Sequence, residues 1–423
     1  MKKEWLLAMC ATAMMASCAK DKTIALDNGA GGTPEEIILG AGQYLSAEVE
    51  QGQPMKAASR GIGSVGDLGA ANNWNGETVY VYGIVSKLIG DEQPTITGDA
   101  QFAINGEAAT APAGTPGATV TSTLQWAKAE ATAETTADKH FYYDGNNLYD
   151  FYGCHVDDAA TATAMKIPTG TNLATDGFSV PVEINGTQDL MVAMPNKEND
   201  RTAGGVDPEV TDTKYLYSAW SSRRGVKPNL VFKHVLTRLT FKAKCGDDPA
   251  PTQPVKITSI QVTGAISDGT LTIIPVGGGN QGFAPGTTTA DFALMAPASA
   301  PQTSKDLEDF LGKEITNTGD GADAFQQIGV PMMLVPGEKY TIVINTEQNM
   351  DGTGDIGENE EGTITKEVTF AGGFLAGKNY NINITVYGLQ EIAVDATLTA
   401  WGEGGDIDID PDDINPPTPS PVP

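Results

Sequence analysis

Cys18 is the residue of this chain best placed for covalent chemistry. It follows Met15-Ala16-Ser17, and the basic residues Lys2 and Lys3 and an apolar run from Trp5 to Ala16 precede it. This run is too short for a permanent membrane span and is typical of a secretory signal that is removed. The sequence Met15–Cys18 is similar to a bacterial lipobox. We therefore expect cleavage before Cys18 and acylation of its sulfur and new amino group; the alternative is an ordinary signal peptide.

Other patterns that could carry chemistry are weak. The stretch Gly61-Ile62-Gly63-Ser64-Val65-Gly66 matches a dinucleotide-binding fingerprint, but a polar segment precedes it and no helical pattern follows. That context favours a loop, because the fingerprint works only between a buried strand and a helix. Asn349–Glu360 approximates the spacing of a calcium loop. It joins two strand-like runs rather than two helices, so an acidic hairpin loop is favoured over a weak calcium site.

The remaining ionisable residues form no recognisable catalytic or metal-binding set. His140, His155 and His234 lack the spacing of metal ligands. Carboxylates are numerous, but nothing singles out a pair of the glycosidase kind. We therefore predict no catalytic residues, no bound metal, no cofactor and no enzyme activity.

The composition limits the classes of partner. A formal net charge of −28 argues against nucleic acid, since phosphate binding needs a basic face. After the signal, no stretch is long and apolar enough to cross a membrane. Cys154 and Cys245 remain once Cys10 and Cys18 are set aside. Two buried thiols are favoured, and a bridge between them in an oxidising compartment is the alternative.

The elements that must position any site are short strands. Frequent Gly and Pro separate alternating or β-branched runs, as expected for strands and turns. Tyr380, Ile382, Ile384 and Val386 alternate with polar residues, which predicts a strand with one buried face. Ser304–Lys313 is predicted to be a helix. The other predicted strands are Thr78–Val85, Phe178–Ile184, Val231–Lys244, Val255–Thr263, Thr270–Ile274, Lys339–Thr346, Ile364–Phe370 and Glu391–Trp401.

Many short strands and almost no helix predict an all-β fold of antiparallel β-sandwiches. The chain length favours two domains, with a break near Arg223–Pro228 where charge and proline interrupt the strand pattern. The predicted parts are a signal peptide at 1–17, a tether with a first strand at 18–60, an N-terminal sandwich at 61–225, a C-terminal sandwich at 226–405 and an acidic, proline-rich tail at 406–423.

Three segments, in this order, resemble the fimbrillin family, the type V pilins of Bacteroidetes. Asp189-Leu190-Met191-Val192-Ala193, followed by Leu230–Phe241, is similar to the family run D-x-M-x-A … L-x-F-x-H-x-L-x-x-L-x-F. Phe370–Val386 resembles its strand F-x-x-G-x-x-Y-x-I-x-I, and Ile392–Trp401 its terminal strand I-x-V-x-A-x-I-x-x-W. We expect His234 and Trp401 to be packing residues within this pattern.

The resemblance implies two transthyretin-like, Greek-key β-sandwich domains behind a lipoprotein signal. It also implies export to the outer membrane as a lipidated precursor, trimming by an arginine-specific protease and assembly into cell-surface fimbriae by strand exchange. The partners would be further copies and tip or anchor subunits, and the fibre would support adhesion and biofilm formation. Within the family, a tip adhesin or anchor subunit is an alternative.

Arg60 matches the trimming step that the resemblance implies. It is the only arginine in the first 200 residues, and small, polar residues surround it before Gly61. Cleavage between Arg60 and Gly61 would remove the anchor and a strand-like run at Glu35–Leu39 with Tyr44–Val49. An ordinary surface arginine is the alternative.

The acidic tail is a candidate donor strand for the groove left by residues 18–60. Ile407 and Ile409 share one face of an extended chain, and Ile414 lies further on. The prolines weaken this hypothesis, because each removes a ladder donor, and a solvated tail is the alternative. Outside the family, a glycan-binding surface lipoprotein would need an aromatic platform, for which Trp74, Trp126 and Trp220 are candidates.

Overall fold

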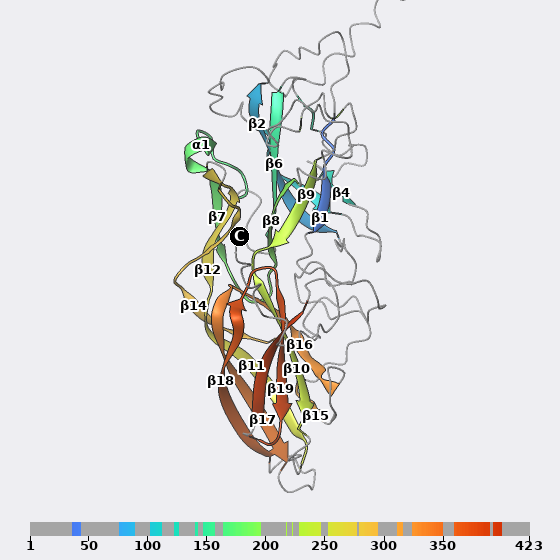
Figure 1. Ribbon diagram of the computed structural model, residues 1–423, viewed down its shortest axis with the longest axis vertical. Helices are drawn as coiled ribbons and strands as arrows, with labels where there is room; N and C mark the ends of the chain where they lie inside the picture. The colour runs from blue at the N-terminus through green and yellow to red at the C-terminus, as the bar shows by residue number, and fades with distance from the viewer. Residues whose placement is uncertain are drawn as a thin grey trace, which may run out of the picture.

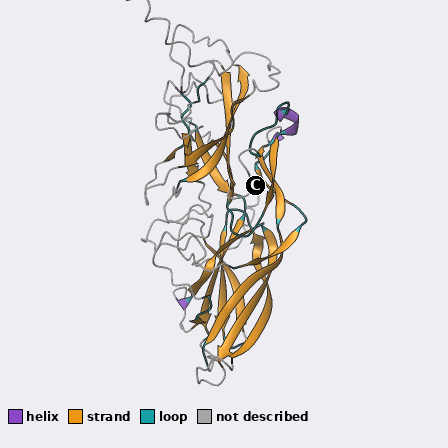
Figure 2. Cartoon of the chain, turned by 180° about the vertical axis from the view of Figure 1, so that it is seen from behind, coloured by secondary structure: helices purple, strands orange, loops and turns teal. Residues whose placement is uncertain are grey.

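The protein consists almost entirely of β-strands (Figures 1 and 2). The computed structural model describes residues 36–43, 76–88, 102–111, 122–126, 140–142, 147–156, 164–195, 217, 222, 228–246, 253–276, 279–294, 311–315, 324–349, 359–389 and 392–399. Cys18, Arg60, Gly61, Ile407, Ile409 and Ile414 lie outside these ranges, so the predictions made for them stay predictions. The all-β prediction is confirmed.

An eight-stranded sheet occupies the upper half of Figure 1, in the order β4-β1-β9-β8-β6-β2-β3-β5. Its pairs are antiparallel except for β1 and β9, which run parallel. Its strands are β1 (Gly40–Gln43), β2 (Glu77–Leu88), β3 (Phe102–Ala111), β4 (Ser122–Thr123), β5 (Gln125–Trp126), β6 (Asn147–Val156), β8 (Leu190–Pro195) and β9 (Asn229–His234).

Two sheets form the lower half of Figure 1 and pack as a sandwich. The four-stranded sheet has the order β16-β10-β19-β20 and comprises β10 (Thr237–Cys245), β16 (Gln326–Leu334), β19 (Asn379–Val386) and β20 (Ile392–Thr399). Its β10 and β19 run parallel. The five-stranded sheet comprises β11 (Val255–Ile266), β14 (Thr289–Ala293), β15 (Glu314–Ile315), β17 (Gly337–Asn349) and β18 (Asn359–Phe374).

A three-stranded sheet, β13-β12-β7, connects the two halves. It consists of β7 (Phe178–Glu183), β12 (Asp268–Ile274) and β13 (Gly282–Pro285), and the short helix α1 (Leu173–Asp176) precedes β7. The Asn172 side chain caps α1 by accepting a hydrogen bond from the Ala174 amide. One apolar core extends from the lower sandwich through this sheet to one face of the eight-stranded sheet. A second, separate core lies on the other face of the eight-stranded sheet.

The eight-stranded sheet closes on itself. Its two outermost strands, β4 and β5, are separated in the chain only by Leu124. Ser122 and Thr123 pair with β1, whereas Gln125 and Trp126 pair with β3 at the opposite end of the strand order. One short segment therefore joins the two ends of the sheet, and β1 is an internal strand rather than an edge.

The strand pairing crosses the predicted domain break. β9 follows residue 226 yet pairs with β8, and β12 from the C-terminal part pairs with β7. The domain division thus stays a prediction, and the hydrogen-bonded sheets do not separate at that point.

Two element predictions need correction. A single strand was expected over Val231–Lys244, but the chain turns at Val235 and Leu236, where the Val235 amide donates to the Leu190 carbonyl (2.9 Å). The alternation of apolar and polar residues continues on both sides of this turn, so the sequence gives no sign of the turn. The helix expected to reach Lys313 has its first seven residues outside the described ranges, and residues 311–313 form a turn before β15.

Candidate functional site

The residues before the predicted cleavage site occupy an internal position in the eight-stranded sheet. We call Glu36–Gln43 the N-terminal segment. Ile37 and Leu39 are 0% and 1% exposed, whereas Ile38 between them is 37% exposed. This alternation is that of an extended chain with one face toward a core. The strand-like run expected at Glu35–Leu39 thus includes two core residues, and the assigned strand β1 begins immediately after it.

On one side, the N-terminal segment pairs with β9. The register is parallel and runs from Gly40 opposite Asn229 to Gln43 opposite Phe232. Leu230 and Phe232 of β9 are fully buried in the core under the segment. The alternating apolar residues of β9, which the sequence already indicated, therefore form one wall of the site.

On its other side, the N-terminal segment meets a wall made of two separate pieces. We call Ser122–Trp126 and His140–Tyr142 together the outer wall. Gly40 and Ala41 pair antiparallel with Thr123 and Ser122. The Leu124 amide donates to the Leu39 carbonyl (2.9 Å), and the Ile37 amide donates to the His140 carbonyl (2.8 Å). The segment thus fills a slot with hydrogen-bonding walls on both sides, as β1, β4 and β9 show in Figure 1.

The floor of the slot is an aromatic core. Tyr142 contacts Tyr149 and Phe151, with ring centroids 4.9 and 6.3 Å apart, and Phe151 contacts Tyr217 at 5.8 Å. Edge-to-face contacts of this kind stabilise a core beyond the area that they bury. Ile37 and Leu39 belong to the same core. Extraction of the segment would therefore leave two apolar cavities above these rings.

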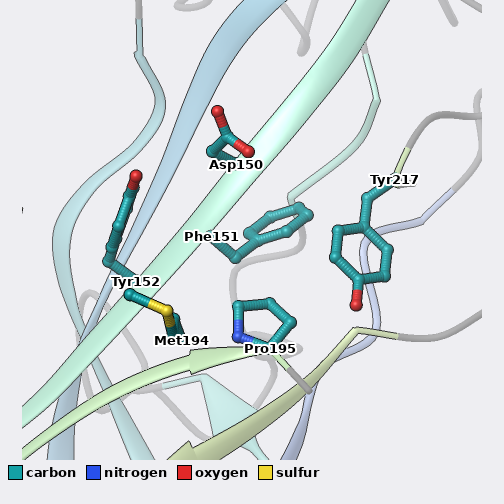
Figure 3. A pocket seen from close by; sticks show the side chains of 6 residues that line it. All are labelled: Asp150, Phe151, Tyr152, Met194, Pro195 and Tyr217. Atoms are coloured by element: carbon teal, nitrogen blue, oxygen red, sulfur yellow. The ribbon is translucent and has the colours of Figure 1, made fainter. Parts of the chain in front are cut away.

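A small pocket lies beside this core at the β6–β8 pair (Figure 3). Its lining is Asp150, Phe151, Tyr152, Met194, Pro195 and Tyr217. Burial raises the pKa of Tyr152, and the nearby Asp150 carboxylate raises it further. The described lining thus supplies one carboxylate and two phenol groups, and it contains no Ser, Cys, His or Lys side chain.

Asp189 and His234, from the sequence run that carries the family resemblance, lie together. His234 Nδ1 donates to Asp189 Oδ1 at 2.9 Å, and the two side chains are 5% and 0% exposed. They sit where the chain leaves the eight-stranded sheet for the lower sandwich. Their burial there confirms the packing role expected for His234. Trp401, the other residue expected to pack, is outside the described ranges.

Both described cysteines are buried, as favoured from the sequence, and no disulfide joins them. Burial raises the pKa of the Cys154 thiol well above its ordinary value. The Cys245 thiol donates to the Ile315 carbonyl at 3.0 Å. The environment of Cys154 therefore disfavours the reactive thiolate.

The described ranges meet the requirements of neither a metal site nor a membrane-spanning helix. Within them, no three His, Cys, Asp or Glu side chains gather as metal ligands. No helix of the described residues has the length and apolar character for a membrane span. Trp126, one of three candidates for a glycan platform, is partly buried and packs on the core under the slot. Sequence reasoning missed its place in the outer wall, because the only signal was an isolated aromatic residue in a weakly patterned stretch.

Comparison with known protein families identifies one family. The family model described as fimbrillin-like matches residues 94–401. No curated protein matches the chain. Among solved structures, a fimbrial protein from Bacteroides vulgatus is 13% identical, with 77% of this chain and 93% of that chain covered and a TM-score of 0.39.

Two further solved structures are also similar to this chain. A candidate cell adhesion protein from Bacteroides uniformis is 12% identical, covers 86% of this chain and 98% of its own, and has a TM-score of 0.40. A tip fimbrial protein from Porphyromonas gingivalis is 10% identical, covers 86% and 100%, and has a TM-score of 0.33. The family match spans most of the chain, and this protein therefore belongs to the fimbrillin-like family.

Proposed function

We propose that this fimbrillin-like chain is a structural subunit of cell-surface fimbriae that polymerises by strand exchange after cleavage at Arg60. The observation that carries the proposal is the place of the N-terminal segment. It lies before Arg60 in the chain, yet it supplies Ile37 and Leu39 to a core and pairs with strands on both sides. A cut at Arg60 makes this internal part of the fold separable.

The vacated slot would be costly in water. Burial of an Ile or Leu side chain contributes about 1.5–3 kcal/mol to the free energy of folding. The contributions of both Ile37 and Leu39 would be lost. The amides and carbonyls of β9 and of the outer wall would also lose their ladder partners, which favours pairing with another chain. Two strand edges would thus be left unpaired, because β1 lies between β9 and β4. A strand from another subunit restores both ladders by β-augmentation.

The acidic tail is the proposed donor. Ile407 and Ile409 have the same two-residue spacing as Ile37 and Leu39, so an extended tail presents two apolar side chains on one face. The last described strand, β20, ends at Thr399 opposite Asn379, which neighbours Arg238 near the start of β10. Thr399, the last described residue before the tail, thus lies close to the junction of the two halves. Because donor and acceptor surfaces differ, the contact is head-to-tail and propagates as a filament.

The membrane steps come before assembly. We propose that acylation of Cys18 holds the precursor in the outer membrane and that an arginine-specific protease releases it by cutting after Arg60. The partners are then further copies and tip or anchor subunits. The acidic chain engages no nucleic acid, needs no cofactor and catalyses no reaction in this scheme. Its product is a fibre that supports adhesion and biofilm formation.

Protease treatment of purified precursor tests the proposal. We expect filaments by electron microscopy after an arginine-specific protease cuts the wild type, and none from Arg60→Gln. Arg201→Gln is the matched control and should still polymerise, because Arg201 follows the segment that must leave. Truncation after Gly405 separates the two parts of the proposal. A truncated subunit that is cut and folded but stays monomeric supports the tail as donor, whereas filaments from it would place the donor elsewhere.

A further inference from the structure

The outer wall of the slot depends on the N-terminal segment for much of its pairing. Ser122, Thr123 and Leu124 bond to the segment on one piece of the wall. The His140 carbonyl and the Phe141 bridge to Glu36 do so on the other piece. These bonds are lost when the segment leaves, at the moment when an incoming strand needs the same groups in place.

Each piece of the wall also has an anchor that does not involve the segment. On the first piece, Gln125 and Trp126 pair with Thr110 and Ala109 of β3. On the second, the Tyr142 ring is buried against Tyr149 at 4.9 Å. Each piece thus has a described contact of its own with the rest of the fold, about a residue or two away from the groups that face the slot.

One side-chain contact joins the two pieces directly. The rings of Trp126 and His140 meet edge to face, with centroids 4.5 Å apart and planes at 73°. Both side chains are partly buried, and Trp126 packs on the core below. His140 supplies the carbonyl that accepts from Ile37, and Trp126 lies two residues from the Leu124 amide that donates to Leu39.

We infer that Trp126 and His140 are positioning residues that keep the outer wall in register for an incoming strand. The inference rests on the proposed function. The ring contact bypasses the N-terminal segment, so it persists after trimming and holds the Leu124 amide and the His140 carbonyl at the spacing at which they meet residues 39 and 37 along one edge of a strand. Without it, the two pieces would lose a direct contact with each other, and a strand arriving in the slot would first have to bring them into register.

Release of the cut segment provides the test. Soluble precursor starting at Cys18 is labelled with a fluorescent maleimide, which reaches Cys18 because Cys154 and Cys245 are buried. After cleavage at Arg60, serial dilution at a fixed low urea concentration gives the dissociation constant of fragment 18–60 from the fall in anisotropy. Loss of an aromatic pair of this kind should raise that dissociation constant about two- to tenfold. We expect this weakening for Trp126→Ala and for His140→Ala.

Three further measurements separate positioning from general stability. Trp126→Phe keeps a ring and should retain most of the affinity for fragment 18–60. The double Ala variant should raise the dissociation constant by less than the product of the two single fold-changes. Phe325→Ala removes a partly buried ring from the lower sandwich and should leave the dissociation constant unchanged. The urea midpoint of uncut Trp126→Ala should fall little, because the tethered segment still orders the wall.

The outcomes distinguish this inference from the proposed function. If wild-type fragment is released and Trp126→Ala and His140→Ala release it with the wild-type constant, the positioning role is wrong. It is also wrong if the free energy of unfolding of the uncut variants falls by as much as the free energy of fragment binding falls in the cut variants. If wild-type protein is not cut at Arg60, or the fragment is never exchanged, the proposed function fails whatever the variants do.

Discussion

His234 Nδ1 lies 2.9 Å from Asp189 Oδ1, and this buried pair joins two sequence motifs that are 45 residues apart. Asp189 immediately precedes β8, and His234 ends β9. The next residues carry the chain into the lower sandwich, where the Gly377 amide donates to the Leu236 carbonyl (2.8 Å) and the Arg238 amide to the Lys378 carbonyl (3.0 Å). The pair thus lies at the junction between the eight-stranded sheet and the lower sandwich.

Removal of one member of this pair should destabilise the whole chain. His234→Ala takes a partner from a fully buried carboxylate, and we expect a loss of about 2–4 kcal/mol in the free energy of unfolding. Asp189→Asn keeps the shape and a hydrogen-bond acceptor and should cost less. Urea denaturation of the precursor measures both. Glu367→Gln is the control, because it breaks an exposed ion pair with Lys339 and should leave the midpoint unchanged. Equal effects of the control and His234→Ala would contradict this role.

Leu39→Ala should destabilise the precursor but not the assembled subunit. In the precursor Leu39 is 1% exposed, and its truncation opens a cavity that costs about 2–5 kcal/mol. Ile38→Ala is the neighbouring control and should cost less than about 1 kcal/mol, since Ile38 is 37% exposed. After trimming, residue 39 is gone, so filaments from both variants should unfold at the wild-type temperature. Filaments that remain destabilised by Leu39→Ala would show that the segment stays in place.

Gly106→Ala tests the packing of β3 against the residues around Met165, which precede α1. Gly106 has φ +58°, and a Cβ there would lie 2.0 Å from the Met165 carbonyl oxygen. Gly76 has φ +88° with open space around it, so Gly76→Ala adds backbone strain alone. We expect Gly106→Ala to lower the midpoint of thermal unfolding by clearly more than Gly76→Ala. Similar shifts for the two variants would contradict the close approach at Met165.

Cys154 should resist thiol reagents in the folded protein across mildly alkaline pH. Burial raises the pKa of its thiol, so the reactive thiolate does not form as the pH rises from 7 to 9. Unfolding returns the pKa to its ordinary value, and labelling in denaturant should then increase over the same range. Because the folded state holds this proton more tightly, its contribution to stability is complete at neutral pH and is lost at alkaline pH. Mass spectrometry of a soluble form that retains only Cys154 and Cys245 reads out the labelling, and rapid labelling of the native protein would contradict the buried environment.

The strands with one buried face were predictable, because their period of two is visible in the sequence. Tyr380, Ile382, Ile384 and Val386 were expected to face a core, and all are 0–1% exposed. β6 was not predicted, because both of its faces are covered: Phe151 lies in one core and Cys154 in the other, so no alternation remains.

The slot itself was only partly predictable. The sequence located a strand before Arg60 but not its partners, since β9 pairs with it from almost 190 residues away. The outer wall was missed because β4 and β5 contain two residues each. Such short pieces have no periodicity, and tertiary contacts alone define them. For the same reason the Trp126–His140 contact has no signature in the sequence.

The N-terminus of the subunits in washed filaments tests the central claim most directly. If the N-terminal segment is the part exchanged during assembly, Edman sequencing or mass spectrometry of the filaments should find Gly61 as the first residue, with residues 18–60 absent. Filaments whose subunits still begin at Cys18, or that retain fragment 18–60 in equal amount, would contradict the account.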